Sequence, residues 1–389
     1  MCKARFKSKL PRRAVIWSAI VANVALGVIV LLPRESGGES VMQVVMWGLY
    51  AYFSIYFPKF IFLIFDAVAS IPRLWKGKAW GWMDVTGGTI ALIVFATMWW
   101  AATINRLSVD VVEKEVEIAG LPEAFDGYRI AQISDLHTGT YGKSNLHINR
   151  LVGKINEAEA DAVVFTGDIV NSQSEELRPH VEALAKMHAK DGCYAILGNH
   201  DYGDYHIWPS AEAKKANMDT LEALYSRTPM RLLRNETVML RRGSDSIALI
   251  GVENIGEPPF NTYGSLDASY PKLDDETTKI LLSHNPRHWD DSIAGNPDVN
   301  VALTLSGHTH AMQIEVGGHS PASLRYETWG GLYSDKDKDY NGGMGNLADR
   351  NGNEREHQLY VNIGAGTVGV PFRLGATPEL TIITLRAKK

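Results

Sequence analysis

Length, composition and charge set the first limits on this protein. The chain has 389 residues, which exceeds one average domain and predicts two parts. Residues 1–107 contain 12 Lys and Arg against 4 Asp and Glu, a net charge of +8, so residues 108–389 carry −13 of the total of −5. An acidic second part argues against a nucleic-acid partner, which requires a basic face. Cys2 and Cys193 are the only cysteines, which excludes a disulfide framework.

Residues 1–107 are predicted to form a membrane region with about three transmembrane helices. The apolar runs Ala14–Leu32, Val41–Ile71 and Val85–Ile104 are near the length that spans a bilayer. Buried core helices of a soluble protein are the alternative, which the basic and aromatic flanks of the runs disfavour.

The positive-inside rule predicts the orientation. Three spans after a basic tail place residues 108–389 outside the cytoplasm, in a multi-pass protein of the cytoplasmic membrane. Pro58 and Lys59 interrupt the second run. If that run crosses twice or not at all, the second part lies in the cytoplasm instead.

From residue 108 the pattern changes to that of an α/β domain. Three apolar runs read as buried parallel strands and alternate with helical stretches, and an alternating stretch before them reads as an edge strand. The expected edge and parallel strands are Val109–Ile118, Tyr128–Ser134, Ala162–Thr166 and Cys193–Leu197, and the helices are Asn145–Glu157, Glu175–Ala189 and Ala211–Arg227. Later strands, expected to form a second, mixed sheet, are Arg231–Leu240, Ile247–Glu253, Lys279–Ser283, Val299–Leu305, Leu359–Ile363 and Leu380–Leu385.

Polar residues that bind divalent metals follow five of these strands. They are Asp135 and His137, then Asp168, then Asn199 and His200, then His284, and finally His308 and His310. Sites in open α/β sheets form at the carboxyl ends of strands, so these side chains are expected at one rim. Carboxylate, amide and imidazole donors together suit Mn, Fe or Zn rather than Ca. Each motif alone is usually an ordinary turn or loop, but the ordered set predicts a metal site.

The same residues suggest a chemistry. A carboxylate shared between two cations holds them roughly 3.5–4 Å apart, where they polarise a phosphoryl oxygen and make hydroxide available near neutral pH. His200 directly follows Asn199. If Asn199 is a metal ligand, His200 lies beside the cations and can donate a proton to a leaving oxygen.

Asp-x-His, Gly-Asp, Gly-Asn-His-Asp, His and Gly-His-x-His, in this order, resemble the calcineurin-like metallophosphoesterase superfamily, within it the membrane-anchored bacterial phosphoesterases. The resemblance covers about residues 108–389 and implies an α/β/β/α sandwich with two divalent metal ions. It assigns one metal to Asp135, His137, Asp168 and His310, and the other to Asp168, Asn199, His284 and His308. His200 takes the position of the general acid.

One position departs from the family pattern. The family usually has Gly-Asp-x-x-Asp, whose second Asp supports the catalytic histidine, whereas this chain has Asn171 there. An Asn side chain can hydrogen-bond the imidazole but stabilises the imidazolium less than a carboxylate does. Asp201 is the other candidate for this support.

These observations predict a membrane-anchored phosphohydrolase that cleaves phosphodiester or pyrophosphate bonds by attack of a hydroxide bridging two metals. The expected partner is a phosphate-ester substrate, and the membrane anchor suits a lipid-linked one. A catalytically silent membrane sensor or scaffold and a protein phosphatase are the alternatives. The complete ligand set disfavours the first, and an extracytoplasmic domain disfavours the second.

Overall fold

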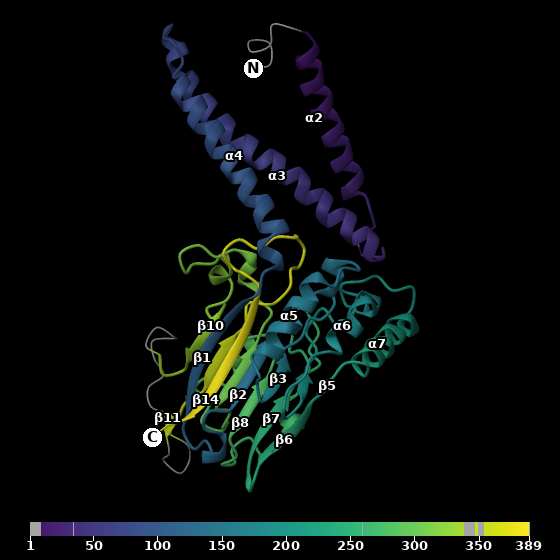
Figure 1. Cartoon of the computed structure of the whole chain (residues 1–389), viewed down its shortest axis with the longest axis vertical. Coiled ribbons are helices and arrows are strands. Elements are labelled where there is room, and N and C mark those ends of the chain that lie inside the picture. The colour runs from purple at the N-terminus through teal and green to yellow at the C-terminus, as the bar shows by residue number, and fades with distance from the viewer. Residues whose placement is uncertain (1–8, 34, 259, 338–346, 349–353, 389) are drawn as a thin grey trace. The chain divides into compact units, whose positions relative to one another are not determined.

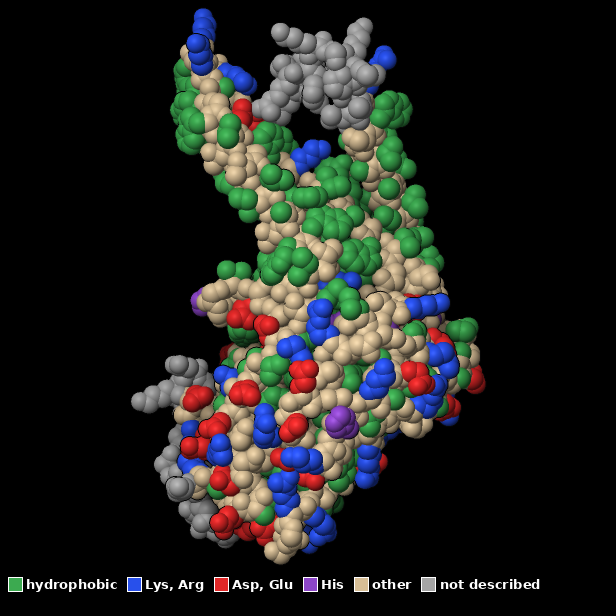
Figure 2. Space-filling model, in the orientation of Figure 1, with side chains coloured by type: hydrophobic (Ala, Val, Ile, Leu, Met, Phe, Trp, Pro, Cys, Tyr) green, Lys and Arg blue, Asp and Glu red, His purple; other side chains and the backbone are tan. Residues whose placement is uncertain are grey.

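The protein forms two units, described here from a computed structural model that covers residues 9–33, 35–258, 260–337, 347–348 and 354–388 (Figure 1). The first unit comprises residues 1–104 with 369–372, and the second comprises residues 105–368 with 373–389. Figure 2 shows hydrophobic side chains gathered over the helices of the first unit, whereas charged side chains are spread across the visible face of the second.

The first unit is helical and apolar. Its elements are α2 (Lys9–Val30), α3 (Glu39–Ser70), the 3-10 helix η1 (Ile71–Trp75) and α4 (Gly81–Thr103). Among the described residues, Glu39–Trp75 and Gly81–Leu107 are long and apolar enough to cross a membrane, and Ile16–Val30 is a shorter apolar helix.

Helix α3 continues through the interruption noted in the sequence. Pro58 lies inside this helix of 32 residues, which is about 48 Å long at about 1.5 Å per residue. Helix α4 packs closely against it, since a Cβ atom at Gly87 would collide with the Phe65 ring. The Tyr50 hydroxyl of α3 also donates to the Met98 carbonyl of α4. Proline is tolerated in such helices because neighbouring helices support the freed backbone groups.

The second unit contains two six-stranded sheets. The first sheet has the order β1-β14-β2-β3-β4-β5, in which β2 to β5 are mutually parallel and β14 runs antiparallel to β2. Its strands are β1 (Asp110–Ile118), β2 (Arg129–Ile133), β3 (Ala162–Phe165), β4 (Cys193–Ala195), β5 (Met230–Leu232) and β14 (Glu379–Ala387).

The second sheet is mixed and has the order β10-β13-β9-β8-β7-β6. Its four central strands are parallel, and the edge strands β10 and β6 are antiparallel to their neighbours. Its strands are β6 (Glu236–Arg242), β7 (Asp245–Gly251), β8 (Lys279–Leu282), β9 (Leu303–Ser306), β10 (Gly331–Ser334) and β13 (Gln358–Val361). A separate two-stranded pair consists of β11 (Leu347–Ala348) and β12 (Glu354–Arg355).

Helices and short turns connect the strands. The α-helices are α5 (Leu146–Glu157), α6 (Val181–Leu184), α7 (Ala211–Tyr225), α8 (Leu266–Ser269) and α9 (Arg287–Ser292). The 3-10 turns are η2 (Asn105–Leu107), η3 (Glu123–Phe125), η4 (Thr138–Tyr141), η5 (Ser174–Glu176), η6 (Arg178–His180), η7 (His310–Gln313) and η8 (Pro321–Leu324).

Three buried clusters define the layers. Alternate residues of each strand point to opposite faces of a sheet, so each sheet contributes to two clusters. Ile130 and Val164 of the first sheet pack with Ile280 and Leu305 of the second, between the sheets. The other face of the first sheet is covered by side chains that include Ile148 and Leu151 of α5 and Leu221 and Leu224 of α7. The other face of the second sheet packs against Trp289 of α9 and its neighbours. The predicted α/β/β/α sandwich is confirmed.

Three details of the predicted elements are wrong. Arg231–Leu240 is not one strand, because the chain turns at Asn235 (φ 53°) and its two halves join different sheets as β5 and β6. Glu175–Ala189 is not one helix but two 3-10 turns and the single turn of α6. Pro179 lacks an amide donor and disfavours a helical residue before it, which accounts for the break. The last strand, β14, lies in the first sheet between β1 and β2.

Candidate metal centre

The candidate site lies where strands of both sheets end. Asp135 and His137 follow β2, Asp168 follows β3, and Asn199 with His200 follows β4 of the first sheet. From the second sheet, His284 follows β8, and His308 with His310 follows β9. The parallel direction of the strands within each sheet brings these ends to one rim.

The backbone at these strand ends is strained. Asp135, His137, Asp168, His308 and His310 all have positive φ angles, between 47° and 73°. Residues other than glycine adopt this conformation infrequently, and such residues cluster at functional sites where surrounding structure holds them. The strain is therefore an indication of function that is independent of the side-chain chemistry.

Asp201 supplies much of that surrounding structure. Its buried carboxylate accepts main-chain N–H groups of Asp168 (2.8 Å), Ile169 (2.9 Å), Val170 (3.2 Å) and Gly198 (2.9 Å). These four bonds tie the turn after β3 to the turn after β4. A Cβ atom at position 198 would collide with the main-chain nitrogen of Asp168, so glycine is required at this close approach.

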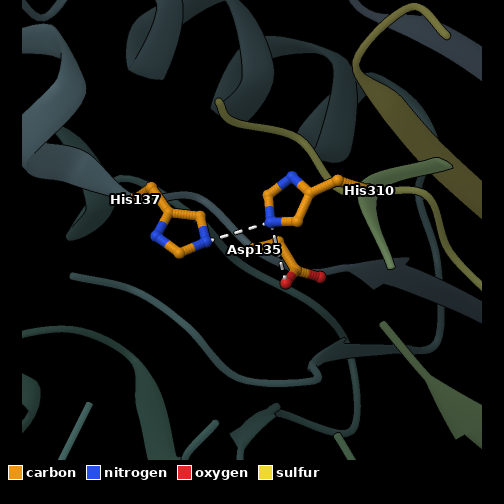
Figure 3. A group of neighbouring side chains, drawn as sticks. All are labelled: Asp135, His137 and His310. Carbon is orange, nitrogen blue, oxygen red and sulfur yellow. Dashed lines mark hydrogen bonds and ion pairs between the residues drawn. The ribbon is translucent and has the colours of Figure 1, made fainter. Parts of the chain in front are cut away.

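The first group of candidate ligands consists of Asp135, His137 and His310 (Figure 3). The Nε2 atoms of His137 and His310 face each other at 3.0 Å, and His310 Nε2 lies 3.2 Å from Asp135 Oδ1. All three side chains are buried. At most one proton fits between two such nitrogens, whereas a shared cation satisfies both of them and the carboxylate.

The second group consists of Asp168, His284 and His308, with Asn199 beside them. His284 Nε2 lies 3.1 Å from Asp168 Oδ2 and 3.0 Å from Asn199 Oδ1. His308 Nδ1 lies 2.9 Å from the same amide oxygen. Carboxylate, amide and imidazole donors thus converge here, as they do for a transition metal.

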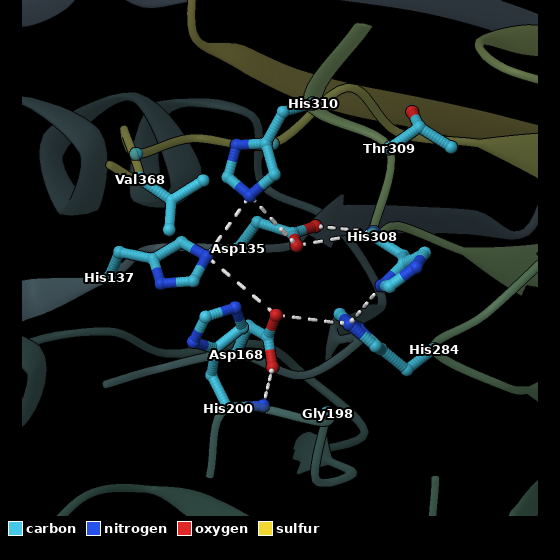
Figure 4. A network of polar contacts seen from close by, with 12 residues as sticks. Asp135, His137, Asp168, Gly198, His200, His284, His308, Thr309, His310 and Val368 are labelled. Carbon is cyan, nitrogen blue, oxygen red and sulfur yellow. Dashed lines mark hydrogen bonds and ion pairs between the residues drawn. The ribbon is translucent and has the colours of Figure 1, made fainter. Parts of the chain in front are cut away.

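Asp168 lies between the two groups (Figure 4). Its Oδ2 atom is 3.7 Å from His137 Nε2 of the first group and 3.1 Å from His284 Nε2 of the second. The other carboxylate oxygen, Oδ1, accepts the main-chain N–H of His200 at 2.8 Å. This bond fixes the carboxylate so that a single oxygen faces both groups.

The pKa values of the candidate ligands favour the protonation states that bind cations. Burial alone would raise the pKa of the Asp168 carboxyl, but nearby imidazoles, His284 foremost, hold it well below its ordinary value. Burial lowers the pKa of His137 well below its ordinary value and that of His308 to about 3, so both rings present lone pairs. Burial opposes protonation of His284 too, yet Asp168 raises its pKa to about 9. The ionised carboxylates therefore stabilise positive charge in the site. Ionised carboxylates and imidazole lone pairs are the ligands that divalent metals require, so these residues fit divalent metals.

Comparison with known proteins identifies the domain. Residues 128–312 match the family described as calcineurin-like phosphoesterase. This chain carries a calcineurin-like metallophosphoesterase domain. Its metal-dependent phosphoester hydrolase chemistry follows from that family and from the names of its relatives.

Three relatives illustrate the range of the similarity. The chain is 28% identical over 408 residues to a Danio rerio "transmembrane protein with metallophosphoesterase domain", covering 99% of this chain and 84% of the relative. It is 28% identical over 284 residues to the metallophosphoesterase YkuE of Bacillus subtilis, covering 72% and 86%. It is also 28% identical over 250 residues to the UDP-2,3-diacylglucosamine pyrophosphatase LpxG of Chlamydia trachomatis, covering 55% and 70%. The apolar helices and the first relative's name together indicate membrane association.

His200 lies at the edge of the metallophosphoesterase centre. Its Nδ1 atom is 2.7 Å from the main-chain carbonyl of Asn171, which accepts the ring N–H. Its ring meets His137 edge-on, with centroids 4.9 Å apart, and stacks on Tyr205 at 4.3 Å. With Nδ1–H committed to a carbonyl, Nε2 is the ring nitrogen left to exchange a proton.

The hydrogen bond that holds the His200 imidazole differs from the expected one, which was to come from the side chain of Asn171 or Asp201. The side chain of Asn171 does not hold the imidazole; its Nδ2 atom donates to the buried carboxylate of Glu176 at 3.0 Å, and only its carbonyl serves His200. Glu176 also accepts main-chain N–H groups of Asn171, Ser172 and Gln173. The carboxylate of Asp201 is committed to main-chain amides of the metal-binding turns. An aspartate at 171 would face Glu176 at close range, which gives a physical reason for the neutral residue.

Sequence reasoning missed the partners that orient the ligands. His284 Nδ1 donates to the Thr166 carbonyl at 2.7 Å, which leaves Nε2 for the centre. The buried Arg373 donates to the carbonyls of Gly366 and Ile363. Its Nη2 atom also lies 3.1 Å from His310 Nδ1. These contacts join residues far apart in sequence, and no local pattern signals them.

A cavity of about 160 Å³ adjoins the second group of ligands. Asn199 and His308 line it, together with the aromatic rings of Tyr205, Phe260 and Tyr326. The Arg325 guanidinium, which forms an ion pair with Glu257, also borders it. A substrate that reaches Asn199 and His308 therefore meets aromatic surface and one paired cationic group.

Proposed function

We propose that this chain is a membrane-anchored phosphohydrolase that uses two divalent cations to cleave phosphodiester or pyrophosphate bonds. The observation that carries the proposal is the placement of Asp168 Oδ2 between two clusters of donors, 3.7 Å from His137 Nε2 and 3.1 Å from His284 Nε2. In this assignment Asp135, His137, Asp168 and His310 hold one cation, and Asp168, Asn199, His284 and His308 hold the other. Mn, Fe or Zn suits these donors.

Each part of the site has a separate role in the proposed reaction. When bound, a pair of cations polarises a phosphoryl oxygen and supplies hydroxide near neutral pH. His200 donates a proton to the leaving oxygen, with Asn171 holding Nδ1 and Tyr205 holding the face of the ring. The cavity beside Asn199 receives the group attached to the phosphate.

A lipid-linked phosphate ester or pyrophosphate is the substrate class we propose. Two observations support it: the long apolar helices of the first unit, and the relative named as a UDP-2,3-diacylglucosamine pyrophosphatase. An enzyme held at a membrane meets lipid-linked substrates at high local concentration. A silent scaffold is disfavoured because all the candidate ligand side chains are gathered at one rim.

Metal removal tests the proposed function. Treating the purified full chain with a chelator should abolish hydrolysis of bis-p-nitrophenyl phosphate, and adding Mn²⁺ should restore it, because the cations supply both polarisation and hydroxide. Absorbance of p-nitrophenolate measures the rate, and an Asp135→Asn, Asp168→Asn double variant is the control for contaminating hydrolases. Full activity in protein shown to be metal-free would contradict the proposal.

For the membrane topology we propose three spans, with the metallophosphoesterase domain outside the cytoplasm. The support is the charge pattern: Arg73, Lys76 and Lys78 lie in the connection between α3 and α4, whereas the sequence between α2 and α3 has one basic and one acidic residue, Arg34 and Glu35. The basic residues before position 9 lie outside the described part of the structure.

Reporter fusions test this topology. A green fluorescent protein fused after Lys389 should stay dark, since it folds poorly after export, whereas a fusion truncated after Lys78 should be bright. Fluorescence per cell at matched expression measures both. A bright fusion after Lys389 would instead place the domain in the cytoplasm, as two spans would.

A further inference from the structure

Two tyrosines touch ligands of the second cation from within the cavity. The Tyr205 hydroxyl accepts the Nδ2–H of Asn199 at 2.8 Å, and the Tyr326 hydroxyl lies 3.0 Å from His308 Nε2. Both tyrosines line the cavity beside the centre. We propose that Tyr205 and Tyr326 are positioning residues that set the affinity of the second cation; this rests on the two-cation function proposed above.

Tyr205 acts on the orientation of the Asn199 side-chain amide. Asn199 must present Oδ1, not its NH₂ group, to a cation, and Oδ1 is the atom that faces His284 Nε2 and His308 Nδ1. The Tyr205 hydroxyl takes the NH₂ end and thereby fixes that orientation. Without the hydroxyl, rotation of the amide by half a turn would direct two N–H donors at the cation. The Tyr205 hydroxyl thus keeps Asn199 Oδ1, rather than the Asn199 NH₂ group, directed at the cation.

Tyr326 acts on the tautomer of His308. Neutral imidazole carries one proton, and the nitrogen that holds it is set by the hydrogen bond that nitrogen makes. A proton on Nε2, donated to the Tyr326 hydroxyl, leaves the lone pair on Nδ1, the atom beside Asn199 Oδ1. Outer partners of this kind typically change metal affinity about 10–100-fold when removed.

The first cation's ligands are supported differently. His310 Nδ1 meets Arg373, which is fully buried and donates to main-chain carbonyls, so its support belongs to the protein interior. Tyr205, in contrast, is 40% exposed. The two cation sites therefore differ in what a change on the cavity wall does to them: loss of a tyrosine hydroxyl weakens the second and leaves the first intact.

Tyr205 also has a second, separable contact. Its ring stacks on His200 with centroids 4.3 Å apart and 23° between the planes. Tyr205→Phe removes the hydroxyl and keeps the ring, whereas Tyr205→Leu removes both. The two substitutions separate the effect on the cation from the effect on the proton donor.

Manganese titration of the full chain in detergent tests the proposal. In the wild type we expect two binding steps; in Tyr205→Phe and Tyr326→Phe the second step should weaken about 10–100-fold and the first should stay unchanged. Tyr194→Phe is the matched control, because its hydroxyl donates to the Asp191 carbonyl at the opposite end of β4. Tyr205→Leu should additionally slow an alkyl leaving group more than p-nitrophenolate, a difference that Tyr205→Phe lacks.

The outcomes separate this proposal from the function it rests on. Unchanged second-step affinity in both Phe variants would overturn the positioning role while leaving the two-cation function in place. Equal weakening of both steps, together with a lower melting temperature, would also overturn it, since the hydroxyls would then be structural. A wild type that binds one cation would contradict the proposed function itself.

Discussion

Replacing Asp168 with Asn should lower kcat/KM for bis-p-nitrophenyl phosphate by roughly 10³-fold or more. Its Oδ2 atom faces both ligand groups, so the substitution removes a negative charge from each cation at once. Metal-ion stabilisation of a phosphoryl transition state is worth several kcal/mol, and about 4 kcal/mol corresponds to this loss in rate. Steady-state kinetics at saturating Mn²⁺, with metal content measured in parallel, provides the test.

Asp161→Asn is the matched control for Asp168→Asn. Asp161 lies just before β3, at the opposite end of the strand from Asp168, and pairs with Arg242 and Lys190. This variant should keep both cations and nearly full activity. If Asp168→Asn also binds two cations and turns over normally, Asp168 does not bridge them.

Replacing His200 with Ala should slow an alkyl or nucleoside leaving group by about 10²–10⁴-fold, the usual contribution of a general acid. The loss should be far smaller for p-nitrophenolate, which leaves readily without a proton. Both cations should remain, because the His200 main-chain N–H, which hydrogen-bonds Asp168 Oδ1, is retained in alanine. Rates for a series of leaving groups of rising pKa give the slope that reports this role.

His206→Ala is the control for the loop that carries His200. His206 lies in the same loop and packs edge-on against Trp208 rather than against the metal ligands. It should leave the leaving-group slope unchanged. An equal slowing of all leaving groups by His200→Ala would assign His200 to substrate positioning, and a loss of metal would assign it to the structure of the centre.

The environment of Asn171 changes what Asn171→Asp should do. From the sequence, a carboxylate at 171 is expected to stabilise the His200 imidazolium. In the structure the side chain points to Glu176, 3.0 Å away, and it is the carbonyl of residue 171 that meets His200. A second buried carboxylate there would be repelled by the first, so the substitution is better regarded as a destabilising change than as a restoration of the family pattern.

Much of the site could be predicted because its signals are local. Asp135 and His137 follow one apolar strand, and Asp168 follows the next, so parallel pairing alone brings them to one edge. His284 and His308 follow β8 and β9, which are also parallel neighbours. The alternation of apolar strands with helices predicted a helix-covered sheet and a second, mixed sheet, whereas the α/β/β/α order of the layers was implied by the resemblance to the family.

The features that could not be predicted from the sequence depend on contacts between distant parts of the chain. Strand β14 comes last in sequence but inserts between β1 and β2, and nothing in Glu379–Ala387 itself indicates which strands it joins. No sequence pattern indicates that Glu176 supports Asn171, because Glu176 belongs to a short 3-10 turn without periodicity. Tyr326 lies between elements, in a stretch with no pattern to align it with His308. Such contacts are set by the packing of the two sheets.

Electron paramagnetic resonance of the full chain loaded with Mn²⁺ tests the central claim most directly. Two cations that share Asp168 would lie roughly 3.5–4 Å apart, close enough for exchange coupling between their spins. We predict two Mn²⁺ per chain and a spin-coupled spectrum that Asp168→Asn abolishes. A single Mn²⁺ per chain, or two that give uncoupled spectra in the wild type, would contradict the two-cation centre.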